Sequence, residues 1–345
     1  GQFVVSSRLD RAIETTSKGK QWNRLENKMK NLAERSAGSL YWWLLATLFL
    51  PIAIPGLVLK LLTMMKEQRN ARHLNGKVVL ITGASSGLGE ALAHSFFLAG
   101  CKVVLAARRK DELERVRKDL LELHATVPTH PPIILPLDLS DLNSIGGKVQ
   151  SVLEIHGAID ILVNNGGISV RGDALSTAID VDIRIMLVNY FGSVALTKAC
   201  LPSMMARKEG RIVSISSVQG KFAIPHRSAY SASKHAMQAF CDSLRAEVAK
   251  DNIKVTLISP GYINTALSLN ALTGTGASYG KMDAATAGGA SPQDTASSIL
   301  KAIARDEKDV MLAPIAPRAA YWLRHLAPSV YFWIMKKRAE KLNST

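Results

Sequence analysis

Six short apolar runs, each separated from the next by a longer segment, limit most strongly what this chain can fold into. The runs lie at 77–82, 102–107, 133–138, 159–164, 211–216 and 254–259, and amphipathic stretches between them include 90–99, 111–124 and 182–205. Strands that are apolar on both faces need cover on both faces, which helices supply in parallel sheets. The alternation therefore predicts an α/β domain with a doubly wound parallel sheet and right-handed crossovers.

Composition places four further segments around this domain. We expect a basic N-terminal segment (1–38), a membrane anchor (39–62), a linker (63–76), the α/β domain (77–310) and an aromatic, basic C-terminal segment (311–345). Residues 39–59 carry no charge, and about 20 apolar residues suffice for a helix to cross the hydrocarbon layer. Pro51 and Pro55 leave a straight span, a kinked or re-entrant helix and an interfacial helix open.

The net charge of +15 is concentrated outside the predicted domain. Segments 1–36, 60–77 and 318–341 hold +13 of it, while 78–317 is nearly neutral. Basic flanks beside apolar stretches indicate attraction to anionic membrane lipids. A nucleic-acid site would place the basic stripe on the folded domain, so we expect no nucleic-acid partner.

Two later stretches interrupt the strand–helix pattern. Residues 270–291 are rich in Gly, Ala, Ser and Thr, which predicts a mobile loop. Residues 317–337 combine aromatic and basic side chains, which favours a segment lying on a membrane, although packed core is the alternative. The three cysteines lie far apart in apolar runs, which predicts buried thiols and neither a disulfide framework nor a metal site.

The first predicted strand ends in the glycine-rich sequence TGASSGLG, residues 82–89, directly before an amphipathic stretch. Glycines at this place let the backbone approach a pyrophosphate, whose charge the N–H groups at a helix start can meet. The second strand ends in Ala107, where an NAD site usually has a carboxylate, and Arg108 follows. Arginine suits a 2′-phosphate, so we expect NADP(H). The alternative is that Arg108 and Arg109 are solvated charges at a helix start.

A tyrosine and a lysine four residues apart, Tyr230 and Lys234, follow Ser217. That spacing puts both on one helix face. A free tyrosine has a pKa near 10, and a nearby ammonium group would lower it toward the range of acid–base catalysis. These residues predict that Tyr230 exchanges a proton with a carbonyl or hydroxyl oxygen.

With these motifs, residues 76–305 resemble the short-chain dehydrogenase/reductase family. The matching positions are TGASSGLG, Asp138-Leu139, Asn164-Asn165-Gly166-Gly167, Asn189, Ser217, YSASK (230–234) and Pro260-Gly261 through Thr265. The resemblance implies a Rossmann-type fold and a catalytic tetrad of Asn189, Ser217, Tyr230 and Lys234. Ser217 would hold the substrate oxygen, Tyr230 would transfer its proton, Lys234 would tune Tyr230 and bind the nicotinamide ribose, and Asn189 would order a water.

The resemblance also implies which residues bind NADP(H). They are Gly83, Ser85, Ser86, Gly87, Leu88, Gly89, Arg108, Asp138, Leu139, Asn165, Gly166, Tyr230, Lys234, Pro260, Gly261 and Thr265. Asp138 would contact the adenine. Two positions depart from the family pattern. Gly167 stands where alanine is more frequent, and Ser86 stands where some NADP enzymes have a second basic residue.

A narrower resemblance, to one member of the family found at membranes, covers nearly the whole chain after the predicted anchor. It rests on residues 160–173, 214–240 and 259–273, and it implies the substrate. It indicates reduction of a lipid-like carbonyl, acyl- or alkyl-dihydroxyacetone phosphate, at the endoplasmic reticulum or peroxisomal membrane with the domain facing the cytosol. Arg171 and Arg227 could bind the phosphate, or form surface salt bridges. A retinoid or steroid dehydrogenase and a membrane-tethered NADP(H)-binding regulator are the alternatives. Oligomeric state stays open, with a homo-oligomer as one option.

Overall fold

The computed structural model describes residues 74–127 and 130–343, together with 24, 27–31, 43, 47, 54–58, 60–62 and 64. The chain divides into two compact units, Gly1–Met65 and Lys66–Thr345. In the first unit, the described residues 54–58 and 60–62 are helical and exposed. Most of the predicted basic segment (1–38), anchor (39–62) and linker (63–76) lies outside the described residues.

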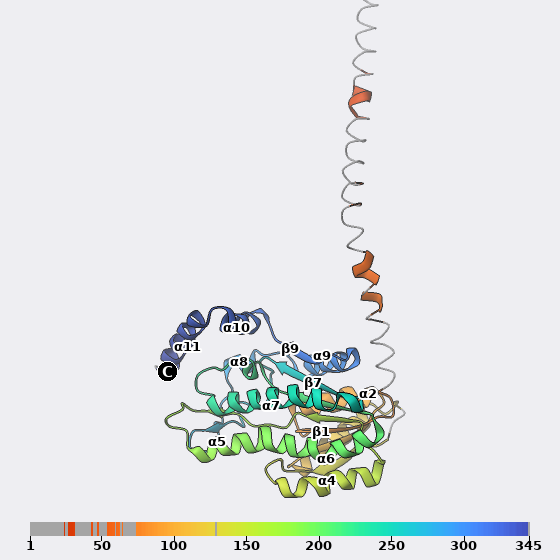
Figure 1. Ribbon diagram of the computed structural model, residues 1–345, viewed down its shortest axis with the longest axis vertical. Coiled ribbons are helices and arrows are strands. Elements are labelled where there is room, and N and C mark those ends of the chain that lie inside the picture. Colours follow the sequence, from red (N-terminus) through yellow and green to blue (C-terminus); the bar gives the residue numbers. More distant parts are fainter. Residues whose placement is uncertain are drawn as a thin grey trace, which may run out of the picture. The chain divides into compact units, whose positions relative to one another are not determined.

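A seven-stranded parallel sheet in the order β3-β2-β1-β4-β6-β7-β9 forms the centre of the second unit (Figure 1). Its strands are β1 (Val78–Thr82), β2 (Lys102–Ala107), β3 (Ile133–Pro136), β4 (Ile161–Asn164), β6 (Gly210–Ile215), β7 (Ile253–Pro260) and β9 (Asp309–Leu312). A separate parallel pair joins β5 (Val170–Arg171) to β8 (Leu272–Thr273). The predicted Rossmann-type parallel sheet is confirmed, and the six apolar runs correspond to six of its strands.

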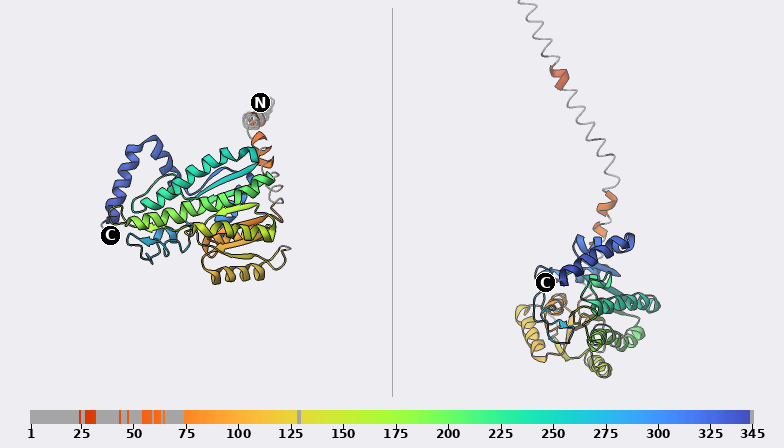
Figure 2. Two further views of the ribbon diagram at one scale, coloured as in Figure 1. Left: turned by 60° about the horizontal axis from the view of Figure 1, so that its bottom comes forward. Right: turned by 90° about the vertical axis from the view of Figure 1, so that its left-hand side faces the viewer.

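Helices cover both faces of this sheet (Figure 2). One face carries α2 (Gly87–Leu98), α3 (Lys110–Leu123) and α9 (Pro292–Arg305), and the other carries α4 (Leu142–His156), α6 (Gly192–Arg207) and α7 (Ser228–Glu247). The remaining helices are α5 (Ile179–Met186), the π-helical η1 (Leu187–Phe191), η2 (Val218–Gly220), α8 (Ala284–Ala287), η3 (Ala249–Asp251), α10 (Ile315–Leu326) and α11 (Pro328–Asn343).

Each face of the sheet has its own hydrophobic core because successive side chains of a strand point to opposite faces. In β1, Val79 and Ile81 lie in the core beneath α2, α3 and α9, whereas Val78 and Leu80 lie in the core beneath α4, α6 and α7. All three cysteines are free and buried, as predicted, and burial raises the pKa of Cys200 to about 12. Packing on both faces therefore explains the uninterrupted apolar runs.

Two predicted segments differ from the structure, the end of the domain and the loop 270–291. The predicted domain end at residue 310 falls inside β9, the edge strand, whose exposed or half-buried side chains give it a weak apolar signal. The predicted mobile loop 270–291 contains β8 and α8. Its small residues have no hydrophobic periodicity, but backbone pairing with β5 and side-chain bonds to Asp283 fix its conformation.

One helix among the described residues is long and apolar enough to cross a membrane by length and composition. It is the continuous helix Ile179–Arg207, built from α5, η1 and α6, and 44% of its most apolar window is buried inside the protein. Because this helix packs on the sheet in the second unit, it is weak evidence for a membrane span. The predicted anchor stays a prediction.

The close contact between α6 and the chain after β3 provides a stability test. A Cβ on Gly192 would lie 2.2 Å from the carbonyl oxygen of Leu139, whereas a Cβ on the exposed Gly146 in α4 would contact nothing within 4 Å. We expect Gly192→Ala to lower the free energy of unfolding by about 1–3 kcal/mol through overpacking. Gly146→Ala should raise it by about 0.5–1 kcal/mol through helix propensity. Denaturant unfolding of both variants measures this, and equal effects would contradict the contact.

Candidate active site

The glycine-rich turn lies where β1 separates β2 from β4, the point at which strand order reverses in the sheet. Gly83 has a φ of +68°, which favours glycine, and a Cβ on Gly89 would lie 2.1 Å from the Gly83 carbonyl oxygen. The backbone N–H groups of Gly87, Leu88 and Gly89 have no acceptor among the described residues. A helix start with unpaired N–H groups at a strand switch point is an anion site that suits a pyrophosphate.

Thr82 fixes the two loops on either side of this site. Its hydroxyl oxygen accepts hydrogen bonds from the backbone N–H groups of Asn165 and Gly166, both at 2.9 Å. The side-chain amide of Asn165 donates to the Thr82 carbonyl at 2.9 Å. Sequence analysis did not assign Thr82 a role beyond its place in the glycine motif, yet it positions the predicted cofactor residues Asn165 and Gly166.

Two basic side chains, Arg108 and Arg109, line the cavity directly after the end of β2. Arg109 donates from Nη2 to the hydroxyls of Ser85 at 3.0 Å and Ser86 at 3.2 Å. Burial raises the pKa of Asp138, but hydrogen bonds from Ser140 and the nearby charges of Arg108 and Arg184 lower it overall. Sequence analysis took Arg109 as a partner of Arg108 only in the solvated alternative. In the structure the Arg109 guanidinium lies beside Ser86. It therefore places a positive charge near the position where some NADP enzymes have a second basic residue.

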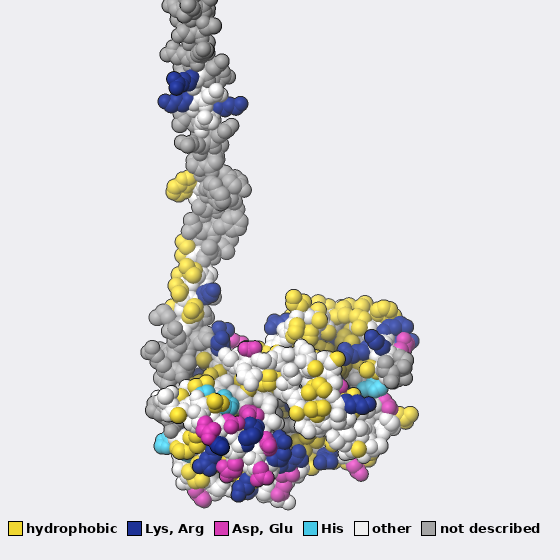
Figure 3. Space-filling model, turned by 180° about the vertical axis from the view of Figure 1, so that it is seen from behind, with side chains coloured by type: hydrophobic (Ala, Val, Ile, Leu, Met, Phe, Trp, Pro, Cys, Tyr) yellow, Lys and Arg dark blue, Asp and Glu magenta, His cyan; other side chains and the backbone are white. Residues whose placement is uncertain are grey.

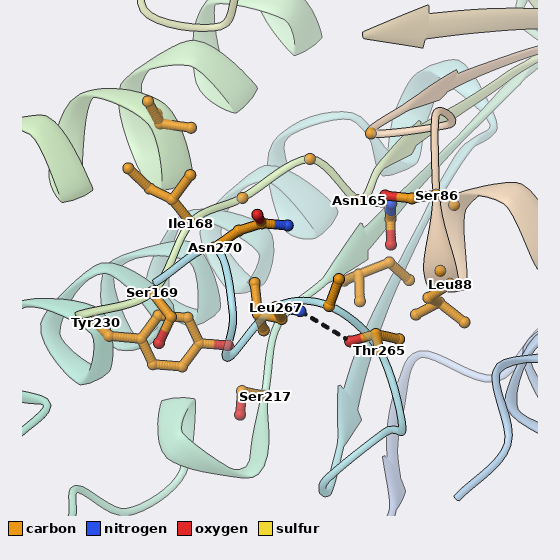
Figure 4. A pocket seen from close by; sticks show the side chains of 18 of the residues that line it. Ser86, Leu88, Asn165, Ile168, Ser169, Ser217, Tyr230, Thr265, Leu267 and Asn270 are labelled. Carbon is orange, nitrogen blue, oxygen red and sulfur yellow. Dashed lines mark hydrogen bonds between the residues drawn. The ribbon is translucent and has the colours of Figure 1, made fainter. Parts of the chain in front are cut away.

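The acid–base residues come from two neighbouring elements. Ser217 lies two residues after the end of β6 and caps η2, and its hydroxyl oxygen accepts a hydrogen bond from the Gln219 N–H at 3.1 Å. Tyr230 lies in the first turn of α7, one helical turn before Lys234. Figure 4 shows Ser217 and Tyr230 at one end of the cavity, Ser86 and Leu88 at the other, and Thr265 and Leu267 between them.

Asn189 lies behind this site, in the π-helical turn η1. Its side-chain oxygen accepts the N–H of Ile168 at 2.8 Å, and its amide donates to the Ile168 carbonyl at 2.9 Å and to the Ser233 hydroxyl at 3.0 Å. Asn189 therefore ties the loop after β4 to α7 beside Lys234. A Cβ on Gly167 would lie 3.1 Å from Asn189 Oδ1 and 3.7 Å from Lys234 Nζ, so the glycine keeps the space between them open.

Burial controls the two titrating residues of α7. Burial raises the pKa of Tyr230, and the Ser217 hydroxyl together with the charges of Arg227 and Arg171 opposes that rise. Burial also lowers the pKa of Lys234 to about 8, although its ammonium donates to the Ile215 carbonyl at 2.9 Å. The rise in the pKa of Tyr230 is opposite to the predicted fall, because the loss of solvation on burial outweighs the hydrogen bond and charges around the phenol.

Arg171 and Arg227 share one carboxylate at the substrate end. Arg171 binds Asp283 Oδ2 through Nη2 at 2.6 Å, and Arg227 binds the same oxygen at 2.8 Å. The two arginine side chains are only 10% and 12% exposed. Arg171 also donates to the Ser169 hydroxyl and the Val170 carbonyl. The cluster carries one net positive charge, and the Arg227 side chain has no other hydrogen bond among the described residues.

One cavity of about 570 Å³ joins these features. Every predicted cofactor residue lines it, as do Ser217, Tyr230, Lys234, Arg171 and Arg227, while Asn189 does not. Lining residues that sequence analysis did not assign include Arg109, Ile168, Ser169, Arg184, Tyr262, Ser268, Asn270, Leu272 and Thr286. Most of these come from the β5 and β8 region, where spacing alone carried no signal. Among the described residues, no group of His, Cys, Asp or Glu could hold a metal ion.

Comparison with known proteins agrees with this geometry. Residues 77–274 match the family described as short chain dehydrogenase. The chain is 59% identical over 316 residues to "Dehydrogenase/reductase SDR family protein 7-like" of Drosophila melanogaster, covering 92% of this chain and 97% of that protein. It is 49% identical over 282 residues to "Dehydrogenase/reductase SDR family member 7B" of Bos taurus, covering 81% and 87%.

A solved structure of a short chain dehydrogenase/reductase from Burkholderia phymatum in complex with NAD is similar, with a TM-score of 0.66 and 23% identity. It covers 74% of this chain and 95% of that one, and at this identity it supports the fold alone. The chain belongs to the short-chain dehydrogenase/reductase family, whose members are oxidoreductases that use a nicotinamide cofactor. Within the family, the chain is therefore similar to the proteins named member 7B, as the narrower resemblance in sequence predicted.

The buried Lys234 gives a pH-dependent stability test. Its pKa is about 8 in the folded protein against 10.5 for an ordinary lysine, so the unfolded chain binds more protons between these values and stability rises with pH there. The cost of burying the ammonium is thus fully present below about pH 8 and is lost toward pH 10.5. We expect Lys234→Met to be about 1–3 kcal/mol more stable below pH 8, with the gain shrinking above it. Denaturant unfolding across pH measures this, and a pH-independent difference would refute the assignment.

Proposed function

We propose that the protein is an NADPH-dependent reductase of a lipid ketone that carries a phosphate, acyl- or alkyl-dihydroxyacetone phosphate, acting at the endoplasmic reticulum or peroxisomal membrane. The observation that carries the substrate proposal is the Arg171–Asp283–Arg227 cluster, a buried site with a net positive charge in the same cavity as Tyr230. A buried excess charge is costly unless a partner meets it, and a substrate anion is such a partner.

The proposed preference for NADPH rests on the two arginines that follow β2. Arg108 and Arg109 line the cavity beside Ser86, and the strand ends in Ala107, so no acidic side chain occupies the usual NAD position. A 2′-phosphate adds about two negative charges that guanidinium groups bind well. The proposal is that Arg108 binds this phosphate and that Arg109, held by Ser85 and Ser86, supports it.

The chemistry divides among residues at the other end of the cavity. The nicotinamide cofactor supplies the hydride when bound. Ser217 holds the substrate oxygen by a hydrogen bond, and Tyr230 donates its hydroxyl proton to that oxygen during reduction. Burial keeps Tyr230 protonated at neutral pH, which suits it as the acid of a reductase. Lys234, with a pKa of about 8, is mainly charged at pH 7 and stabilises the phenolate that proton transfer leaves.

The two arginines have different parts in substrate binding. Arg171 uses its donors on Asp283, Ser169 and Val170, so it holds Asp283 in place. Arg227 has one bond to Asp283 and keeps donors for a phosphate. Apolar side chains in the same cavity, among them Ile168, Leu267 and Leu272, suit the start of an acyl or alkyl chain.

Replacement of Arg108 tests the cofactor proposal. We expect Arg108→Ala to weaken NADPH binding by about 1.5–3 kcal/mol, the value of a hydrogen bond to a charged group, and to leave NADH binding nearly unchanged. Fluorescence titration with both cofactors measures this. Lys118→Ala, an exposed cation on α3 away from the cavity, is the control. Equal weakening of NADPH and NADH would show that Arg108 does not bind the 2′-phosphate.

Replacement of the two arginines tests the substrate proposal. Arg227→Gln should raise the KM for acyl-dihydroxyacetone phosphate at least about tenfold, or 1.4 kcal/mol, because a phosphate contact is lost. It should barely change the KM for an uncharged ketone of equal chain length. Arg171→Gln should lower the melting temperature more than Arg227→Gln does, because it releases more hydrogen bonds.

Steady-state kinetics with NADPH and both ketones measures these effects. Tyr230→Phe serves as the negative control, since it removes the transferable proton and should abolish turnover while NADPH still binds. If Arg227→Gln changes both substrates alike, the arginine is structural, and a retinoid or steroid substrate then becomes the better reading.

A further inference from the structure

The helical hairpin of α10 and α11 exposes an unusually apolar surface. Figure 3 shows hydrophobic side chains gathered along the top edge of the folded domain, over these two helices. The largest exposed side chains are Ile315, Trp322, Leu326, Phe332, Trp333 and Ile334. We call this set the hairpin surface. Contiguous apolar patches of this kind on a folded domain mark a site that another apolar body covers.

Basic side chains flank the hairpin surface. Residues 318–341 contain six Lys and Arg against the single acid Glu340, which pairs with Lys337. Arg324 lies over the ring of Phe332, 4.9 Å from its centre. A face that combines large apolar and aromatic side chains with an excess of cations has the composition of an interfacial segment on anionic lipid.

The opposite side of the hairpin packs against the catalytic end of the domain. Tyr331 is only 3% exposed, and its hydroxyl donates to the Ala223 carbonyl. It forms a small core with Val218, Phe222 and Ile224, and Val218 is the neighbour of Ser217. Three residues before the hairpin begins, the last residue of β9, Leu312, accepts a hydrogen bond from the Gly261 N–H at 2.9 Å. The hairpin itself is thus packed on the segment that follows Ser217.

We propose that the hairpin surface docks on an anionic phospholipid bilayer without crossing it, and that Tyr331 transmits this contact to the loop after Ser217. A second copy of the chain is a poorer occupant. Symmetric self-association through this face would bring two basic rims together, whereas an anionic bilayer neutralises them. Docking fixes α11, and through Tyr331 it restricts the segment 218–225 beside the catalytic serine.

A single-cysteine label measures docking in the full chain. The native cysteines are buried and burial raises the pKa of Cys101 to about 12, so an introduced exposed cysteine reacts selectively. We place an environment-sensitive fluorophore on Leu326→Cys, with Leu123→Cys on α3 as the matched control. These leucines are 77% and 71% exposed. The labelled proteins are mixed with vesicles of phosphatidylcholine, with or without phosphatidylserine.

The label at 326 should shift to the blue and be quenched by brominated lipid when phosphatidylserine is present, while the label at 123 should not change. Lys336→Gln with Arg338→Gln should lower the docking equilibrium about thirtyfold, since each cation near an anionic surface contributes about 1 kcal/mol. A label at 326 that stays exposed to water would overturn the proposal. So would a lipid-independent blue shift that grows with protein concentration, because it indicates a second copy.

Hydrogen–deuterium exchange tests the transmission step. Docking on phosphatidylserine vesicles should slow exchange in 218–225 severalfold. Tyr331→Phe, which removes only the hydroxyl, should keep the docking signal at 326 and lose this protection. Unchanged exchange on docking, or equal protection in Tyr331→Phe, would refute the transmission. Neither measurement uses turnover, so this proposal can fail or stand independently of the proposed substrate.

Discussion

The contact between the first turn of α2 and the end of β1 is the constraint on which the site depends. No side chain fits between the Gly83 carbonyl and Gly89, where an added Cβ would lie 2.1 Å from the oxygen. The first residues of α2 line the cavity, and their backbone N–H groups have no acceptor in the described part of the chain. Thr82, on the same turn, then fixes the loop after β4. The shape of the predicted pyrophosphate site and the position of the loop after β4 thus follow from one close approach of backbone.

At the end of the cavity that holds Tyr230 and Lys234, burial of ionisable side chains lowers stability but suits proton transfer. A lysine and a tyrosine are both buried where each would be more stable uncharged, and burial shifts their pKa values in opposite directions. The result at neutral pH is a neutral Tyr230 beside a mainly cationic Lys234. In the proposed mechanism this pair donates a proton and then stabilises the negative charge that forms, which would explain why a destabilising lysine is kept there.

The proposed substrate site and the proposed membrane contact rest on two separate features, a charged cluster in the cavity and an apolar surface on the hairpin. Asp283 is shared by Arg171 and Arg227, which keeps both arginines ordered while one positive charge remains for a ligand. The hairpin of α10 and α11 is packed on one side and apolar on the other. An amphiphilic substrate with a charged head and a long chain would match these two features. In the two proposals together, the arginine cluster would bind the charged head of the substrate, and the membrane contact would keep the site close to the bilayer that holds its long chain.

The sequence by itself determined the sheet, the glycine turn and the spacing of Tyr230 and Lys234, because these depend on local periodicity and on residues close together along the chain. It did not reveal β9, whose side chains are exposed or half-buried, or β5 and β8, which have only two residues each. Only the tertiary structure placed Asp283 between Arg171 and Arg227, Arg109 against the glycine turn, and Tyr331 against the loop after Ser217. Each of these contacts joins two segments that are distant in sequence. Which residues meet therefore depends on how the helices and strands pack, and the spacing of residues along the chain does not predict it.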